Sequence, residues 1–392
     1  MEKTKVKTLV RQIRGVSYKP EDLHNELDDN SVVLLRANNI DEGKINFDDV
    51  VYVDKSKVSD EQYLKYGDIL ICASSGSKNL VGKAASIRFN TECTFGAFCK
   101  VIRPKEGLDE YLSVYFQSPI YRRKISEVAI GVNINNIRNE HIDELDIPVF
   151  SNDEQASIVK KIHLIQEVIS NRKAELEKLD DLIKARFVEM FGDPNDTKRL
   201  SDSRHKIGEL CDVTKLAGFE FTEYINYQDS GEIIMLRGLN CKQGKLVLDN
   251  VKYIDRETSN KLPRSRLYVG DILMTYAGTI GDVAMVDEDD KYHLAPNVAK
   301  ISIVAKDMLN PTFLVHLFMY SHDYIMTFAS QVAQASINMQ KIRDFEYIIP
   351  SMEEQIEFEQ FANQVNKSKV AVQKTLEQTQ TLFDSLMQKY FG

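Results

Sequence analysis

Two halves of this 392-residue chain contain the same short motifs in the same order, about 200 residues apart. Leu-Arg at 35–36 recurs at 236–237, and Gly-Asp-Ile-Leu at 67–70 recurs at 270–273. Ile-Pro followed by Glu-Gln occurs within 147–155 and again within 349–355, and Phe-Gly occurs at 191–192 and 391–392. Because a fixed period marks a repeated structural unit, the sequence predicts two related domains with internal pseudo-two-fold symmetry.

The composition is ordinary for a globular protein, with 43% hydrophobic and 28% charged residues, and the length is sufficient for two cores. No apolar run is long enough to cross a bilayer, and the charged first residues are unlike a signal peptide, so we expect a cytoplasmic protein without a membrane partner. The five cysteines, Cys72, Cys93, Cys99, Cys211 and Cys241, form no Cys-x-x-Cys pair. We therefore expect reduced, buried thiols and no metal site.

Each half begins with segments that are predicted to form short strands and ends with a segment whose apolar residues have helical spacing. Strands are predicted at 31–35, 67–72 and 98–102, followed by a helix over 111–128. The second half repeats this order with strands at 233–236, 270–274 and 299–303 and a helix over 311–329. We therefore assign residues 1–150 and 207–350 to two similar α+β domains. Residues 193–206 are polar and rich in turn-forming residues, which predicts a linker.

Two long helices are predicted at 151–192 and 351–392. Residues 152–191 contain neither proline nor glycine, and their apolar side chains recur at heptad spacing. The predicted seam comprises Ile158, Ile162, Ile165, Ile169, Leu176, Leu179 and Ile183 in the first helix, and Phe358, Phe361, Val365, Val372, Leu376, Phe383 and Leu386 in the second. We expect the helices to pair as an antiparallel coiled coil. The alternative is that each helix packs only on its own domain.

The sequence contains no convincing catalytic set, since it has no Gly-x-Gly-x-x-Gly, His-Glu-x-x-His or Gly-x-Ser-x-Gly motif. Polar loops at corresponding places in the two halves are candidates for DNA contacts, because Asn, Gln and Arg pair with base edges. The candidates are Arg36, Asn38, Ser74, Ser75, Lys78, Asn133, Asn135 and Asn136 in the first half, and Arg237, Asn240, Thr275, Tyr276, Gln334, Ser336, Asn338 and Gln340 in the second. The alternative is turn chemistry alone. The net charge of −9 counts against DNA binding by the chain alone.

The order, spacing and duplication of these motifs resemble the DNA-specificity subunit of type I restriction–modification enzymes over essentially the whole chain. Proline followed by Glu-Gln at the start of a long helix is the most specific feature. Pro350 and Glu354-Gln355 match it. The first half departs from it, because five residues separate Pro148 from Glu154.

The resemblance implies two target-recognition domains, each of which reads one half of a bipartite sequence in double-stranded DNA. It implies that the helices form an antiparallel coiled coil that sets the spacing between the domains. It also implies docking of two modification subunits, which bind S-adenosylmethionine and methylate adenine, and of two restriction subunits with ATP and Mg where these exist. This chain would contain no catalytic residue, cofactor or metal. The competing hypotheses are a duplicated peptide- or glycan-binding protein with a coiled-coil rod, and a freestanding enzyme.

Overall fold

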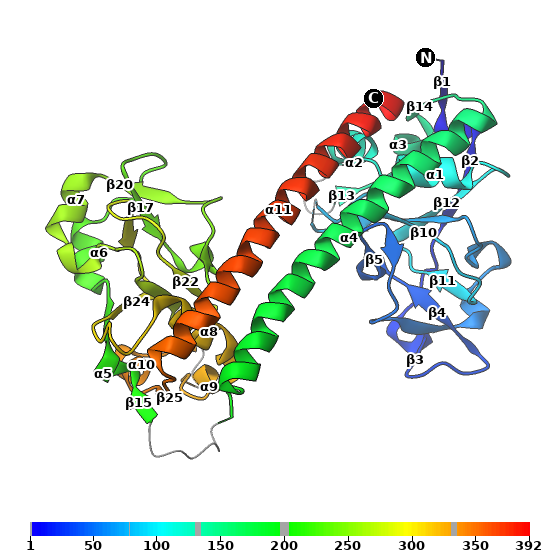
Figure 1. The fold of residues 1–392 in the computed structure, drawn as a ribbon. Helices are drawn as coiled ribbons and strands as arrows, with labels where there is room; N and C mark the ends of the chain where they lie inside the picture. The colour runs from blue at the N-terminus through cyan, green and yellow to red at the C-terminus, as the bar shows by residue number, and fades with distance from the viewer. Residues whose placement is uncertain (1, 78, 130–134, 197–203, 331–334) are drawn as a thin grey trace. The chain divides into compact units, whose positions relative to one another are not determined.

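The computed structural model describes residues 2–77, 79–129, 135–196, 204–330 and 335–392, which form two compact units (Figure 1). Unit 1 comprises Met1–Lys173 with Gln373–Gly392, and unit 2 comprises Ala174–Val372. Each unit contains a mixed domain of strands and helices together with parts of the two long helices, α4 (Asn152–Phe191) and α11 (Met352–Phe391). The predicted α+β class, with two similar domains and two long helices, is confirmed.

Unit 1 contains two four-stranded sheets. The first is antiparallel with the order β10-β8-β12-β2, and the second has the order β11-β4-β7-β3 with β11 parallel to β4. The two-stranded pairs are β1-β14, β5-β6 and β9-β13. The bounds are β1 Lys3–Lys5, β2 Val10–Arg14, β3 Leu23–His24, β4 Ser31–Leu35, β5 Ile40–Asp41, β6 Lys44–Ile45, β7 Val51–Asp54, β8 Ile69–Cys72, β9 Ser74–Ser75, β10 Ala84–Ser86, β11 Cys93–Phe95, β12 Cys99–Pro104, β13 Asn135–Asn136 and β14 Asp146–Pro148.

Unit 2 repeats this arrangement. Its sheets have the orders β16-β24-β21-β22 and β20-β17-β23, and β15-β25 and β18-β19 form two-stranded pairs. The parallel pair recurs as β17 with β23. The bounds are β15 Arg204–Lys206, β16 Cys211–Lys215, β17 Ile233–Leu236, β18 Cys241–Lys242, β19 Lys245–Leu246, β20 Lys252–Ile254, β21 Ile272–Thr275, β22 Val283–Met285, β23 Tyr292–Leu294, β24 Val298–Ile303 and β25 Glu346–Ile348.

Short helices follow the same duplication. In unit 1 they are α1 Asp109–Phe116, α2 Pro119–Val128, α3 Asn139–Asp143 and the 3-10 helices η1 Val6–Thr8, η2 Pro20–Asp22, η3 Ala37–Asn39, η4 Lys55–Lys57 and η5 Asp60–Gln62. In unit 2 they are α5 Ile207–Leu210, α6 Gly218–Tyr224, α7 Arg256–Lys261, α8 Pro311–Tyr320, α9 His322–Met326, α10 Met339–Arg343, η6 Gly238–Asn240 and η7 Pro263–Ser265.

The single helix predicted at 111–128 is wrong, because the structure has two helices there. Helix α1 ends at Phe116, and the hydroxyl of Ser118 caps the start of α2 by accepting a hydrogen bond from the Tyr121 N–H at 3.1 Å. Pro119 at the first position of α2 cannot continue a preceding helix. The helix predicted at 311–329 is likewise divided at Ser321 into α8 and α9.

The central strand β8 explains why the Gly-Asp-Ile-Leu motif is followed by apolar residues. Ile69 and Ile71 pack with the helices on one face of the sheet, whereas Leu70 and Cys72 pack on the other face against the second sheet. Successive side chains of a strand point to opposite faces, so a strand covered on both faces is continuously apolar. The equivalent strand β21 divides Ile272 and Leu273 between two clusters in the same way.

The motif's glycine and aspartate form the turn before that strand. Gly67 and Gly270 have φ angles of +87° and +88°, which a side chain disfavours. The buried Asp68 carboxylate accepts a hydrogen bond from the Lys65 N–H at 2.8 Å, and Asp271 accepts one from the Tyr268 N–H at 2.9 Å. This motif is therefore a structural turn.

The two long helices run antiparallel within each unit. In unit 1, Ile158 and Ile162 from the start of α4 share a core with Phe383 and Met387 from the end of α11. In unit 2, the end of α4 packs in the same way against the start of α11, where Arg186 Nη2 lies 2.7 Å from Glu357 Oε1. All the predicted seam residues are buried or half-buried, namely Ile158, Ile162, Ile165, Ile169, Leu176, Leu179, Ile183, Phe358, Phe361, Val365, Val372, Leu376, Phe383 and Leu386. The seam residues that belong to the hydrophobic cores of units 1 and 2 share these cores with residues of a domain and of the other long helix.

The Ile-Pro markers of the two halves are not structurally equivalent. Helices α4 and α11 begin 200 residues apart, and so do β14 and β25, so that Phe150 takes the place of Pro350. The amide of Gln155 donates to Phe150 O, and the amide of Gln355 donates to Pro350 O, each at 2.9 Å. This explains why the first half departs from the proline spacing. The strand and the helix entry fix the register, whereas the proline does not.

Residues 204–206, assigned to the linker from the sequence, form strand β15, which pairs with β25. The Asn195 amide donates to Tyr320 O at 2.8 Å, so the start of the linker contacts unit 2. In the described part of the chain, no helix combines the length and apolar character needed to span a membrane. All five cysteines are free and buried, as predicted.

Candidate nucleic-acid interface

Four loop segments of unit 1 are linked by backbone hydrogen bonds into one surface. Gly96 N donates to Leu35 O at 2.9 Å, Ala73 N donates to Phe98 O at 2.9 Å, and Ile137 N donates to Ala73 O at 2.8 Å. Strand β13 also pairs with β9. We call residues 36–39, 73–75, 96–98 and 135–138 the loop face of unit 1. It brings together the loops that the sequence identified after Gly-Asp-Ile-Leu and before Ile-Pro.

The same bonds recur in unit 2. Ala295 N donates to Leu236 O at 3.2 Å, Tyr276 N donates to Asn297 O at 3.1 Å, and Ile337 N donates to Tyr276 O at 2.8 Å. An isolated bridge between Ala277 and Ser336 replaces the β9-β13 pair. The loop face of unit 2 therefore comprises residues 237–240, 276–278, 295–297 and 335–338. The backbone framework is shared, whereas the side chains on it differ.

One arginine has the same position and similar contacts in both faces. Arg36 Nη2 donates to the Asp49 carbonyl oxygen at 3.2 Å and to its carboxylate at 3.0 Å. Arg237 Nη2 donates to Asn250 O at 2.7 Å and to Asn250 Oδ1 at 3.2 Å. The buried Nε of each arginine has no hydrogen-bond partner within the described residues. Both guanidinium groups are thus anchored through Nη2, which leaves Nη1 to donate to a ligand, because Nε is buried.

Two candidates in unit 2 are structural residues, which corrects the sequence prediction. Asn240 is fully buried, accepts from the Arg237 N–H at 3.0 Å, and donates to Val247 O at 2.7 Å. Thr275 is also fully buried, and its hydroxyl bonds to Thr279 O within the turn after β21. Neither side chain can reach DNA. Asn39 has the role of Asn240 in unit 1, so the alignment of Asn38 with Asn240 is displaced by one residue.

The other candidates differ in exposure. Asn38, Asn136, Asn338 and Gln340 are exposed, whereas Ser74, Ser75, Tyr276 and Ser336 are half-buried. Asn38 donates to Asp49 Oδ2 at 2.7 Å, Asn338 Oδ1 caps α10 by accepting from the Lys341 N–H at 2.9 Å, and Gln340 donates to Asp344 at 3.1 Å. Lys78, Asn133 and Gln334 lie outside the described residues, and Asn135 is described by its backbone alone.

A cavity of about 450 Å³ opens on the loop face of unit 1. Arg36, Asn38 and Ser74 line it, so the fold brings these three candidates together. Tyr18 and Phe98 also line it, and sequence reasoning missed both of them. Phe98 was assigned to a strand, but β12 begins at Cys99 and leaves Phe98 in the preceding turn. The sequence signal for Phe98 was an aromatic residue directly before the start of a strand. Apolar alternation alone does not show whether such a residue belongs to the strand or precedes it.

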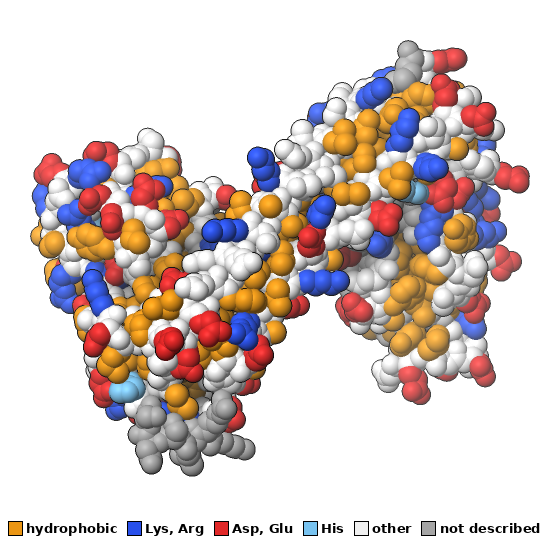
Figure 2. Space-filling model, viewed as in Figure 1, with side chains coloured by type: hydrophobic (Ala, Val, Ile, Leu, Met, Phe, Trp, Pro, Cys, Tyr) orange, Lys and Arg blue, Asp and Glu red, His pale blue; other side chains and the backbone are white. Residues whose placement is uncertain are grey.

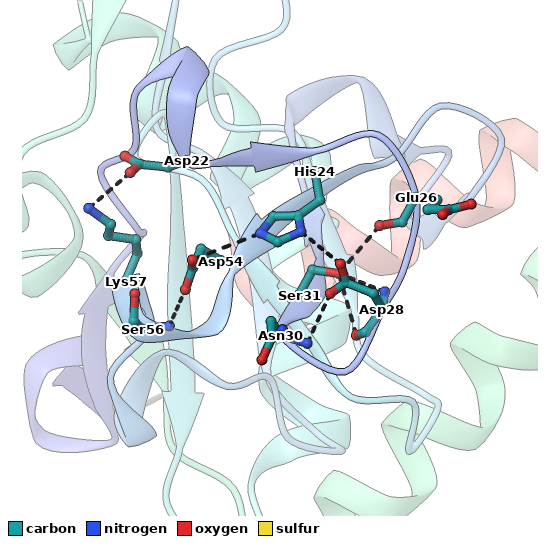
Figure 3. A network of polar contacts seen from close by, with 9 residues as sticks. All are labelled: Asp22, His24, Glu26, Asp28, Asn30, Ser31, Asp54, Ser56 and Lys57. Atoms are coloured by element: carbon teal, nitrogen blue, oxygen red, sulfur yellow. Dashed lines mark hydrogen bonds and ion pairs between the residues drawn. The ribbon is translucent and has the colours of Figure 1, made fainter.

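A polar cluster in unit 1 surrounds His24 and belongs to segments outside the loop face (Figure 3). His24 Nδ1 lies 2.9 Å from Asp28 Oδ2, His24 Nε2 lies 3.9 Å from Asp54 Oδ2, and the Lys57 ammonium lies 2.9 Å from Asp22. These contacts connect η2, β3 and η4 to β7, which is a structural role. Within the described ranges, no three His, Cys, Asp or Glu side chains are grouped as a metal site requires.

Charges of both signs are interspersed on the face of the molecule drawn in Figure 2. The acidic run at 287–290 is used in local contacts. Asp287 accepts from the Tyr292 hydroxyl at 2.9 Å, Asp289 accepts from the Val269 N–H at 2.8 Å, and Asp290 pairs with Arg266. Much of the negative charge near this loop therefore stabilises unit 2 itself. Beside the loop face of unit 2, the Lys215 ammonium lies 5.5 Å from the centre of the Tyr276 ring.

Comparison with known proteins gives one consistent result. A family model described as the type I restriction modification DNA specificity domain matches residues 18–179 and 204–379. The chain is 29% identical to the specificity subunit of the type I restriction enzyme StySPI from Salmonella potsdam, over 98% of this chain and 86% of that protein. It is 34% identical to the EcoKI specificity subunit of Escherichia coli K12, over 70% of this chain and 61% of that protein.

Two solved structures share the fold. One is the S subunit of a type I restriction–modification system from M. genitalium, with a TM-score of 0.52 and 14% identity, covering 100% of this chain and 96% of that chain. The other comes from a study of complex assembly and conformational transition of the type I R-M system, with a TM-score of 0.56 and 15% identity, covering 100% of this chain and 97% of that chain.

Proposed function

Because this chain belongs to the type I restriction modification DNA specificity family, we propose that it is the DNA-reading subunit of such a complex. Each loop face contacts one half of a bipartite sequence in double-stranded DNA. Residues 1–150 and 207–350 are the two target-recognition domains, and α4 with α11 sets the distance between the half-sites.

The observation that carries this proposal is the duplicated loop face. Three backbone hydrogen bonds recur between equivalent segments, yet the side chains they display differ, with Asn38 against Leu239 and Phe98 against Asn297. A constant framework that displays different side chains suits the reading of two different base sequences, because base contacts specify and the framework positions them. A duplicated peptide- or glycan-binding module remains the alternative outcome of the test.

The chain acts without chemistry of its own, and its partners supply the reaction. Two modification subunits bind S-adenosylmethionine and methylate adenine, and restriction subunits with ATP and Mg join where they exist. Exposed apolar side chains on the long helices offer surface for such docking. They are Leu164, Val168, Leu182, Val188, Ile356, Val370 and Leu382, all at least 37% exposed.

The decisive experiment maps methylated adenines by single-molecule sequencing in cells that contain the modification subunit, with and without this chain. We expect one bipartite motif that depends on the chain. Replacing residues 1–150 with the corresponding domain of a relative should change one half of the motif only. A change in both halves, or in neither, would contradict the assignment of one half-site to each domain.

A binding measurement tests the role of the partners. With a net charge of −9, the lone chain should bind the motif weakly. The complex with modification subunits should bind tightly and lose affinity with salt, with a log–log slope of about −0.9 per neutralised phosphate. Tight, salt-insensitive binding by the lone chain would contradict this arrangement.

A further inference from the structure

Phe98 and Asn297 occupy equivalent positions at the tips of the two loop faces. The carbonyl oxygen of Phe98 accepts from Ala73 N, and that of Asn297 accepts from Tyr276 N, which follows the equivalent strand. On both sides of each tip the neighbouring strand residues are buried. The tip residue is therefore exposed, whereas the residue before it is half-buried and the strand that follows it is buried.

The side chain of Phe98 contributes little to the fold. Its side chain is 69% exposed, and no other large apolar side chain in the described ranges is more exposed. Folding gains little from an aromatic ring in water, because apolar stabilisation follows the area removed from solvent. The ring lies at the edge of the cavity that Arg36 and Asn38 line. It is thus an apolar surface beside two hydrogen-bonding side chains, which is the combination needed to contact a base edge.

Asn297 places an amide at the same tip. Its φ angle is +68°, a left-handed conformation that asparagine tolerates better than most residues. The backbone alone would thus account for asparagine or glycine at this position. The side chain is nevertheless exposed, and its amide has no hydrogen-bond partner among the residues that the structure describes. Its donor and acceptor are available to a ligand.

We propose that Phe98 and Asn297 are specificity-determining residues, each for the half-site read by its own unit. Phe98 contacts the C5-methyl group of a thymine, because this methyl is the apolar feature of the major groove. Asn297 pairs with the N6 and N7 edge of an adenine, the base whose acceptor and donor match a side-chain amide. This inference rests on the proposed function and identifies the bases that the two tips contact.

The first test removes one methyl group from the DNA. The probe is a DNA duplex that contains the motif identified by methylation mapping in cells. The complete complex of this chain and its modification subunits binds it. Each thymine of the half-sites is replaced in turn by deoxyuridine. The wild-type complex should lose about fourfold in affinity at one thymine, as expected for one buried methyl group. Phe98→Ala should bind the thymine duplex more weakly and lose its response to deoxyuridine at that position.

The second test removes one acceptor. Each adenine is replaced by 7-deazaadenine, which lacks N7, and the wild-type complex should lose about tenfold in affinity at one position, within the range of a paired amide contact. The variant is Asn297→Gly, because glycine keeps the positive φ angle while removing the amide. It should no longer respond to the substitution. Thermal unfolding of both variants should match that of the wild type.

The outcomes separate this inference from the proposed function. If chain-dependent methylation of a bipartite motif persists while neither base analogue changes wild-type affinity, the assignment of the two tips is wrong and the DNA-reading function stands. A uniform loss of affinity for all duplexes in either variant, or a half-site without thymine for unit 1, would also overturn the assignment. If no methylation or binding depends on the chain, the proposed function itself fails.

Discussion

The backbone N–H of Asn310 donates to Gln355 Oε1 at 2.8 Å, which connects the start of α8 to the first turn of α11. Gln355 is fully buried, and its Nε2 donates to Met308 O and Pro350 O at 2.9 Å each. The preceding Glu354 accepts from Ser351 N at 3.0 Å and completes a capping box. The Glu-Gln motif therefore has two physical roles, in which the glutamate caps the helix and the glutamine attaches it to the domain.

Replacing Gln355 with leucine should destabilise unit 2. The change leaves Asn310 N, Met308 O and Pro350 O without their partner, and a buried unsatisfied group costs about 1–3 kcal/mol. Gln155→Leu is the matched control, because Gln155 is half-buried and donates only to Phe150 O among its described contacts. Thermal unfolding should show a larger decrease in Tm for Gln355→Leu. Equal decreases would contradict the proposed anchoring role.

Much of this fold could be predicted from the sequence because its signals are local. The duplicated motifs, the apolar run of β8 and the heptad spacing of α4 all follow from residues that are close in the chain. The registration of the two helix entries could not be predicted, because Pro148 and Pro350 are conspicuous but not equivalent. The pairing of β14 and β25 with distant strands and the equivalent contacts of Gln155 and Gln355 establish it.

The candidate interface was predicted in part for the same reason. The loops were identified by their polar residues, but long-range backbone bonds determine which side chains face outward. Asn240 is buried in its turn, although the composition of its loop is typical of a binding loop. Phe98 was missed, because an apolar residue is expected in the core and only the position of the strand start places it at the tip.

The thiols should be unreactive in the native protein. Burial raises the pKa of Cys93, Cys211 and Cys241 to about 12, and it raises the pKa of Cys72 and Cys99 as well. Because the thiolate is the reactive form, reaction with a chromogenic disulfide at pH 8 should be slow, and five thiols should react after denaturation. One rapidly reacting thiol in the folded protein would contradict the buried environment.

The stability of unit 1 should depend on pH through the cluster in Figure 3. The hydrogen bond with His24, with further bonds from Ser31 and Asn30, lowers the pKa of the Asp28 carboxyl below its usual 3.8. Because the pKa of Asp28 is lower in the folded protein than in the unfolded chain, its stabilising effect is complete above pH 3.8. The effect is lost as the pH falls through the pKa of the folded state.

Asp28→Asn should therefore show a shallower loss of unfolding free energy below pH 4 than the wild type. Asp29→Asn, at an exposed neighbouring position, is the control and should follow the wild-type curve. Denaturant unfolding monitored from pH 2 to 6 measures both. If the unfolding free energy of Asp28→Asn falls with pH as steeply as that of the wild type, this carboxyl is not a source of the pH dependence.

The long helices should determine the number of unread base pairs between the half-sites. Their buried positions repeat with an offset of 200 residues, since Ile158, Ile162 and Phe187 correspond to the buried Phe358, Ala362 and Met387. Deleting residues 169–175 and 365–371 together removes one heptad from each helix and preserves the phase of both seams. Each deletion shortens its helix by about 10 Å at 1.5 Å per residue, close to three base pairs at roughly 3.4 Å.

Methylation mapping of the double deletion should show unchanged half-sites with a shorter gap, or no methylation where no whole-base-pair register fits. The half-sites should persist, because both loop faces lie outside the deleted segments. Each single deletion is the control, since it displaces one seam against the other and should abolish activity. The deletion also removes the pair between Lys173 and Glu42 at 2.7 Å, but both side chains are exposed and such a pair contributes little. A double deletion that is fully active at the original spacing would show that the helices do not measure the DNA.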